Sequence, residues 1–327
     1  MTVQLARGSL LLVLFATAAL AGPTPRRDDE VAVILSKPCE PRTSGPIEMI
    51  SAERAWCAAE AEANADLARP LWEVAAIAFD KALPSAGMEK ATAAEAAVIA
   101  WGLALDSIAT PQFPAATKPT PFSTQETAFL RSLDRYLKLA TQGDIPGLLI
   151  TRAQRYRLHR RFDEAVPSLV EVVTTYPGSE VAEFAANYLL EALDRQGKVD
   201  QRDEWVEKMR ANKTLLKSRE DLIQHLDALH LQKVRTQAEM AEAAGARDPS
   251  AYMRCAQLYV DEVTANPRYE HRDELLFKAA SCYERAGAIA DAARTFQAVV
   301  KVPRSRLAAE ARSRAAKLLP RTAPAPK

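Results

Sequence analysis

Glycine and aromatic residues are scarce in this chain: there are 11 glycines among 327 residues, and aromatic residues make up only 6%. Long alternating runs of Val, Ile and Thr, which are typical of sheet strands, are also missing. Hydrophobic residues nevertheless account for 48%, much of it alanine, which is enough for a sizeable core. Because alanine loses no side-chain entropy in a helix, this composition predicts an all-α fold.

The sequence also lacks an excess of charge. Removing residues 1–21 takes away Arg7 and no acid, which leaves 42 Lys and Arg against 42 Asp and Glu. Binding to nucleic acid depends on a clear cationic excess, so nucleic acid is not an expected partner.

The common catalytic motifs H-E-x-x-H, G-x-S-x-G and G-x-x-x-x-G-K-[ST] are absent. His225 and His230 are five residues apart, which places them about 140° apart on a helix and is poor for joint metal ligation. The cysteines lack the close pairs of a zinc site. We therefore predict no catalytic residues, no metal and no cofactor, and expect a protein that is not an enzyme.

The apolar run from Gly8 to Leu20 is too short for a stable membrane-spanning helix. Arg7 precedes it, and Ala19-Leu20-Ala21 then fits a small-x-small cleavage site. Residues 1–21 are therefore predicted to be a signal peptide, with an uncleaved anchor as the alternative. No cysteine follows the run directly, as a lipoprotein requires. We expect a soluble, exported, periplasmic protein with no membrane span after cleavage.

Four cysteines remain after processing, and an even number in an oxidising compartment predicts disulfides. Cys255 and Cys282 are equidistant from the expected turn at residues 266–270, so they should face each other on two antiparallel helices. Cys39 and Cys57 form the remaining, second expected pair.

Proline-rich segments divide the chain. Residues 22–47 are expected to be an extended lead-in, residues 109–123 a linker, and residues 320–327 a disordered tail. Between them lie a predicted N-terminal helical module at 48–108 and a repeat domain at 124–319. In the module, Ser51 is a candidate N-cap and Pro70 is expected to end the first helix.

Helical periodicity in the repeat domain predicts paired helices joined by short turns, and residues 212–243 are expected to form one or two long helices. The predicted pairs are 147–160 with 162–176, 179–196 with 199–210 and 249–265 with 271–286, followed by 289–301 and 304–319.

Two distant segments share a spacing. Ala153 and Ala165 are twelve residues apart, as are Ala280 and Ala292, and each pair falls on two successive predicted helices. Facing small residues let paired helices approach closely, and neighbouring pairs must stack to bury their apolar faces. A weaker middle copy has Arg202 at the expected small position. The pattern predicts an irregular α-solenoid of stacked antiparallel helix pairs, with a plain helical bundle as the alternative.

These segments resemble the tetratricopeptide repeat (TPR). The sequence from Thr175 to Glu180, together with the surrounding helices, is similar to bacterial periplasmic repeat proteins. Examples are the helical lipoprotein of the outer-membrane β-barrel assembly machine and the cell-division coordinator that accompanies Tol-Pal. The resemblance implies a TPR-like scaffold or adaptor that binds protein or peptide segments of the cell envelope.

Arg155 and Arg157 belong to an Arg-rich run and are candidates for binding partner carboxylates. The alternative is a solvated helix flank with acidic neighbours. A rival function is that of an envelope hydrolase, with its catalytic part at 48–108 and the TPR-like domain attached.

Overall fold

The computed structural model describes residues 39–106, 118–141, 143–267 and 269–318. Within these ranges the chain forms fourteen α-helices, one 3-10 turn and no strand, which confirms the all-α prediction for this part of the chain. The predicted signal peptide and the tail at 320–327 lie outside the described residues, as do most of the lead-in and of the linker.

The described residues form two compact units that are interleaved along the chain. Unit 1 contains the residues up to Arg202 and then Asn212–Lys217, while unit 2 contains Asp203–Ala211 and the residues from Ser218 onward. Helix α10 (Val199–Ala211) therefore begins in unit 1 and ends in unit 2, and the short helix α11 (Lys213–Leu216) returns to unit 1.

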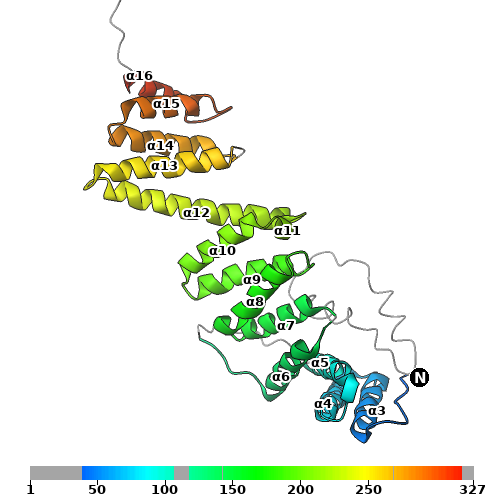
Figure 1. Ribbon diagram of the computed structural model, residues 1–327. Helices are drawn as coiled ribbons and strands as arrows, with labels where there is room; N and C mark the ends of the chain where they lie inside the picture. Colours follow the sequence, from blue (N-terminus) through cyan, green and yellow to red (C-terminus); the bar gives the residue numbers. More distant parts are fainter. Residues whose placement is uncertain (1–38, 107–117, 142, 268, 319–327) are drawn as a thin grey trace, which may run out of the picture. The chain divides into compact units, whose positions relative to one another are not determined.

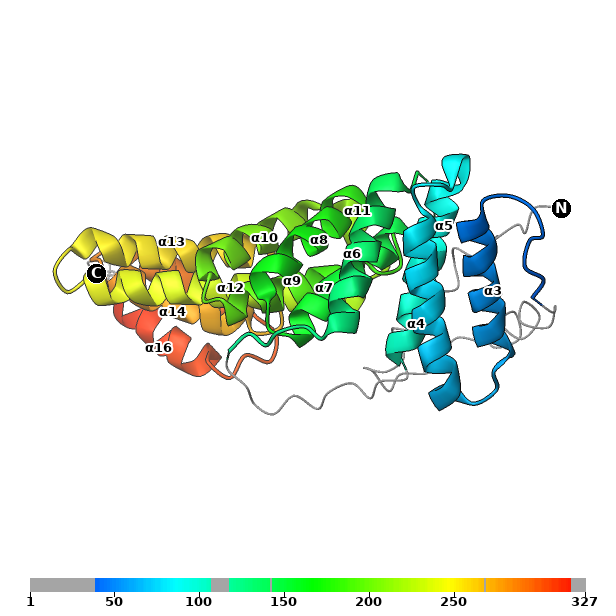
Figure 2. The same cartoon turned by 90° about the horizontal axis from the view of Figure 1, so that it is seen from below.

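Unit 1 opens with α3 (Ile47–Ala61), α4 (Ala65–Ala82) and α5 (Lys90–Asp106), which lie alongside one another (Figure 2). A 3-10 turn, η1 (Gly87–Glu89), precedes α5. The core between these helices is built mostly from alanine, with Trp101 of α5 only 3% exposed. Small side chains let the three helices pack closely, as the alanine-rich composition suggests.

Pro70 does not end a helix as predicted, because it lies inside α4. The break comes earlier, at Asn64, whose side chain accepts hydrogen bonds from the backbone N–H groups of Asp66 and Leu67. A proline inside a helix removes one backbone hydrogen bond and clashes with the preceding turn. The buried face that includes Ala75 and Phe79 offsets that cost, because it is available only if α4 continues.

Helix α6 (Thr124–Leu139) begins at a capping box in which Ser123 and Glu126 each bond the other's backbone N–H. Ser51, the N-cap predicted from the sequence, instead lies inside α3 and donates to the carbonyl of Ile47. Helix α3 starts directly after Pro46 without a side-chain cap.

Replacing Ser123 by alanine is expected to lower the free energy of unfolding by about 1 kcal/mol, the usual value of an N-cap side chain. Replacing Ser51 by alanine removes the same hydroxyl from an exposed mid-helix position and should change stability by less than about 0.5 kcal/mol. Urea denaturation followed by circular dichroism compares the two variants. Equal losses would contradict the assignment of Ser123 as the cap.

Three helices complete the body of unit 1, namely α7 (Ile145–Leu158), α8 (Phe162–Thr175) and α9 (Ala182–Arg195). Helix α8 packs on α7 and on α9. Ala153 and Ala165, the small residues of the predicted repeat, are 1% and 0% exposed. Arg202, at the small position of the middle copy, is itself buried, and its guanidinium bonds Asp194 on α9 at 2.7 Å.

Unit 2 consists of the second half of α10 and five further helices, each of which packs on its chain neighbour from α12 to α16 (Figure 1). These helices are α12 (Glu220–Ala244), α13 (Pro249–Ala265), α14 (Arg272–Arg285), α15 (Ile289–Val300) and α16 (Ala308–Leu318). The predicted helical stretches from 147 to 319 agree with the helices from α7 to α16 within a few residues at each end.

Three helix pairs share one turn geometry: α7 with α8, α9 with α10, and α14 with α15. Each turn has a residue with positive φ, which is Arg160 (55°), Gly197 (68°) or Gly287 (75°). The next residue donates its N–H to a carbonyl five positions back, the hydrogen bond of a Schellman motif. These bonds are Arg161 to Tyr156, Lys198 to Leu193 and Ala288 to Tyr283, each 2.9 Å long.

A second turn geometry also recurs, this time in the longer connections. These are the turns that precede α9, α14 and α16. Each contains two successive hydrogen bonds in which a backbone N–H donates to the carbonyl three residues earlier. The bonds run from Ser179 to Tyr176 and Ala182 to Ser179, from Tyr269 to Asn266 and Arg272 to Tyr269, and from Ser305 to Val302 and Ala308 to Ser305. Short and long turns of two fixed kinds thus recur along both units.

Candidate functional site

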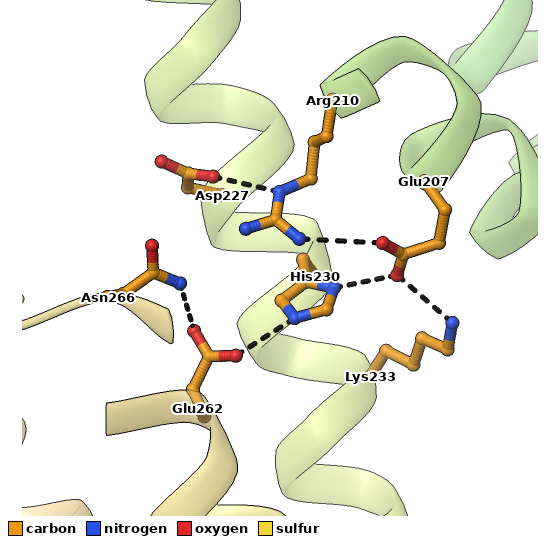
Figure 3. Close-up of polar contacts among 7 residues, drawn as sticks. All are labelled: Glu207, Arg210, Asp227, His230, Lys233, Glu262 and Asn266. Carbon is orange, nitrogen blue, oxygen red and sulfur yellow. Dashed lines mark hydrogen bonds and ion pairs between the residues drawn. The ribbon is translucent and has the colours of Figure 1, made fainter. Parts of the chain in front are cut away.

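A group of charged side chains in unit 2 surrounds His230, where α10, α12 and α13 meet (Figure 3). His230 lies between two carboxylates: its Nδ1 is 2.7 Å from Oε1 of Glu207, and its Nε2 is 2.9 Å from Oε2 of Glu262. A neutral imidazole carries a hydrogen on only one nitrogen. Because both nitrogens face carboxylates, the arrangement fits a protonated ring that donates on both sides.

The electrostatics agree with this assignment. The hydrogen bond to Glu262 raises the pKa of His230 against the opposing effect of burial, and the bond to Glu207 adds to the rise. In Glu262 the bond from His230 lowers the carboxyl pKa although burial opposes it. Burial acts to raise the pKa of Glu207, but the bonds from His230 and Lys233 outweigh it and leave that pKa lowered.

The remaining members complete the network. Lys233 donates to Glu207 at 3.1 Å, and Arg210 reaches both Glu207 and Asp227. Asn266, the C-cap of α13, donates to the second oxygen of Glu262 at 2.6 Å. Three cations thus meet three carboxylates. Such a balanced group can hold three helices together, but the imidazole has both nitrogens engaged and offers no free base or nucleophile.

A second buried histidine, His159 at the end of α7, connects that helix to α6 and to the segment before it. Its Nδ1 is 3.0 Å from the hydroxyl of Thr120, and its Nε2 is 2.9 Å from Oε1 of Glu126. The ring also packs against Phe122 with centroids 4.5 Å apart. As in His230, both ring nitrogens are used in contacts that hold parts of the fold together.

Both expected cysteine pairs are present as disulfides. Cys255 on α13 and Cys282 on α14 have Cα atoms 6.0 Å apart, and Cys39 and Cys57 have theirs 5.2 Å apart. In the described ranges, one group of potential metal ligands comes together, formed by Glu242 and the sulfurs of Cys255 and Cys282. Those sulfurs are bonded to each other, so they supply no thiolate for a metal ion.

The structure places Arg155 and Arg157 on different sides of α7, as expected for residues two positions apart on a helix. Arg155 points toward α6, where its guanidinium is 4.0 Å from Glu126 and 5.8 Å from the ring centre of Phe129. Arg157 points toward α9, bonds Glu191 at 2.7 Å and stacks over Tyr188 at 4.0 Å. The two side chains are not brought together, and both contact groups of the chain itself.

None of the helices in the described ranges is both long and apolar enough to cross a membrane. The sequence matches no family model and no curated protein.

Proposed function

We propose that this protein is a non-catalytic, exported scaffold or adaptor that binds protein segments of the cell envelope through a TPR-like array of helix pairs. The observation that carries the proposal is the recurrence of two turn geometries between successive helices, in both units. A repeat architecture stacks similar helix pairs so that each contacts its neighbours, which gives an extended surface for a peptide or a helix.

Packing of the small residues supports the same proposal. Ala280 and Ala292, the second pair with twelve-residue spacing, are both 0% exposed on α14 and α15. The middle copy has the large residue Arg202 at the position expected to be small. The ion pair with Asp194 neutralises the charge of this buried side chain, so the position tolerates it. Two disulfides fit an exported chain, since such bonds persist in oxidising compartments.

The rival hydrolase function gains no support from the described part of the 48–108 module. One of its carboxylates, Asp80, accepts hydrogen bonds from Ser132 at 2.7 Å and Trp101 at 3.4 Å and pairs with Arg135 at 3.2 Å. These contacts join α4 to α5 and α6. The carboxylate of Asp80 therefore serves to hold these helices together.

Changing Arg155 and Arg157 to glutamate tests whether this part of α7 contacts a partner. Because Arg157 is the more exposed of the two, R157E is expected to weaken recovery of at least one cross-linked partner by about tenfold, the value of one lost charge-assisted contact. Arg155 packs inward, so R155E needs a parallel measurement of folding by circular dichroism.

The matched control is Arg195→Glu, because Arg195 is exposed and also pairs with Glu191, at 3.9 Å. It should leave the set of partners unchanged. If R155E and R157E also leave the set unchanged, these residues are not contacts, although the scaffold function is not affected. Turnover of a substrate by the purified protein would contradict the scaffold function itself.

A further inference from the structure

Positive charge is concentrated at the end of unit 2. Residues 301–318 contain six Lys and Arg but a single acid, Glu310, although the whole chain has a net charge of only +1. One of the six, Arg314, pairs with Glu284. The other five are exposed, and none has an ion-pair partner among the described residues. We call them the basic end surface: Lys301, Arg304, Arg306, Arg312 and Lys317.

Two residues of the basic end surface, Lys301 and Arg312, line a groove of about 320 Å³ between α15 and α16. Val300 and the buried Ala315 give it an apolar lining, while the exposed Lys301 and Arg312 add two cations to the same groove. A concave apolar site with a few polar groups is the usual form of a binding site, in which the apolar part gives affinity and the charges give orientation. The lining residues are Gln297, Val300, Lys301, Arg312, Ala315 and Ala316.

We propose that the groove binds an acidic segment of a partner protein, which inserts an apolar side chain between α15 and α16 and sets carboxylates against Lys301 and Arg312. This inference rests on the proposed function, that the chain binds protein segments. Charge complementarity selects an acidic partner, because unpaired guanidinium and ammonium groups form strong hydrogen bonds with carboxylates.

Two other occupants fit the observations less well. An anionic membrane attracts any cluster of basic residues through its surface charge, and this attraction does not require a groove with an apolar lining. Residues 319–327 of the chain itself contain Arg321 and Lys327 and no acid side chain, so their charge has the same sign as the basic end surface.

The probe is a fluorescent peptide of eight residues, in which two leucines are flanked on each side by three acidic residues. The full protein should bind it in a fluorescence-anisotropy titration. The double variant K301E/R312E should weaken binding by at least about tenfold, because each lost charge-assisted contact is worth a factor of about ten. Ala316→Phe, which fills the groove without changing charge, should also weaken binding.

The control variant is K213E/K217E, which reverses two exposed lysines at α11, outside unit 2. It should bind the peptide within about twofold of the unchanged protein, since long-range charge effects are screened at physiological ionic strength. A second control peptide has serine in place of both leucines, and its binding should be weaker than that of the leucine peptide.

Four results would overturn the inference. The first is that the peptide does not bind, and the second is that K301E/R312E binds it as tightly as the unchanged protein. The third is tighter binding to phosphatidylcholine vesicles containing one third phosphatidylglycerol, which would assign the surface to membranes. The fourth is a rise in peptide affinity of about tenfold when residues 319–327 are deleted, which would assign the groove to the tail.

Cross-linking in envelope extracts separates this inference from the proposed function. If K301E/R312E retains every partner and the peptide does not bind, the scaffold function stands and the basic end surface is not its docking site. If the unchanged protein recovers no partner at all, the scaffold function itself fails.

Discussion

Replacing both Cys255 and Cys282 with alanine is expected to lower the free energy of unfolding of unit 2 by about 3–4 kcal/mol. The disulfide closes a loop with a sequence separation of 27, and a cross-link of that size removes much of the conformational freedom of the unfolded chain. Both cysteines are almost fully buried in the cluster around Tyr259, so the substitution also removes packed sulfur atoms. A typical domain has a total stability of only about 5–15 kcal/mol, and the loss is therefore a large part of it.

Amide hydrogen exchange measures this effect separately in each unit. The double variant should show faster exchange throughout α13 and α14. Replacing Cys39 and Cys57, which lie in unit 1, should leave exchange in those two helices unchanged. If the unit 2 variant exchanges like the unchanged protein, the bridge between the two helices does not contribute to stability.

His230→Phe should destabilise unit 2 by about 3 kcal/mol near pH 5.5, at the lower end of the cost of breaking a buried ion pair. Phenylalanine keeps a ring in the same space but donates no hydrogen bond, so Glu262 loses the bond that it accepts from the imidazole. The Glu262 side chain is 6% exposed and cannot recover its hydration, whereas Glu207 is 39% exposed and can. The desolvated carboxylate is therefore the main source of the loss.

This loss should depend on pH in a defined direction. The raised pKa of His230 gives a stabilisation that is fully present below its ordinary value of 6.5 and disappears as the pH rises through the higher folded value. The lowered pKa of Glu262 gives a stabilisation that is present above its ordinary value of 4.5 and disappears as the pH falls through the lower folded value. The difference between the unchanged protein and His230→Phe is therefore expected to be largest between pH 4.5 and pH 6.5.

Urea denaturation at several pH values, followed by the fluorescence of Trp205 in a variant without the three other tryptophans, reports on this unit. The control is His271→Phe, because the His271 side chain is 57% exposed and its nearest carboxylate is 3.9 Å away. That variant should show little change at any pH. A stability difference for His230→Phe that stays constant from pH 5 to pH 9 would contradict the protonated assignment.

Most of the helices from α7 onward could be predicted because their ends are determined locally. Gly197 and Gly287 adopt positive φ in short turns, and sequence patterns detect such glycines well. The prediction that Pro70 ends a helix is wrong for a non-local reason. The lost hydrogen bond follows from the sequence, whereas the burial of α4 depends on the other helices that pack against it. The prediction that Ser51 caps a helix is wrong because several residues near a helix start can serve as a cap, and α3 already begins at Ile47, directly after Pro46.

The His230 network could not be found from the sequence. The two glutamates that contact the imidazole lie 23 and 32 residues from the histidine, on other helices, and nothing in the chain distinguishes them from solvated glutamates. A sequence alone indicates only local relations such as i, i+4 pairs. The same limit applies to Arg157, whose bond to Glu191 joins α7 to α9 across 34 residues of chain.

The return of α11 to unit 1 sets an order of completion as the chain is synthesised from its N-terminus. Leu215 of α11 is 0% exposed, and Asn212 caps this short helix. Unit 1 therefore lacks one of its fully buried side chains until residue 217 has emerged, after the first segment of unit 2 has already been made. Domains usually fold one after another during synthesis. Here Asp203–Ala211, the first segment of unit 2, is synthesised before unit 1 can complete its folding. This segment stays without its partner helices during that time, so the folding of the two units overlaps.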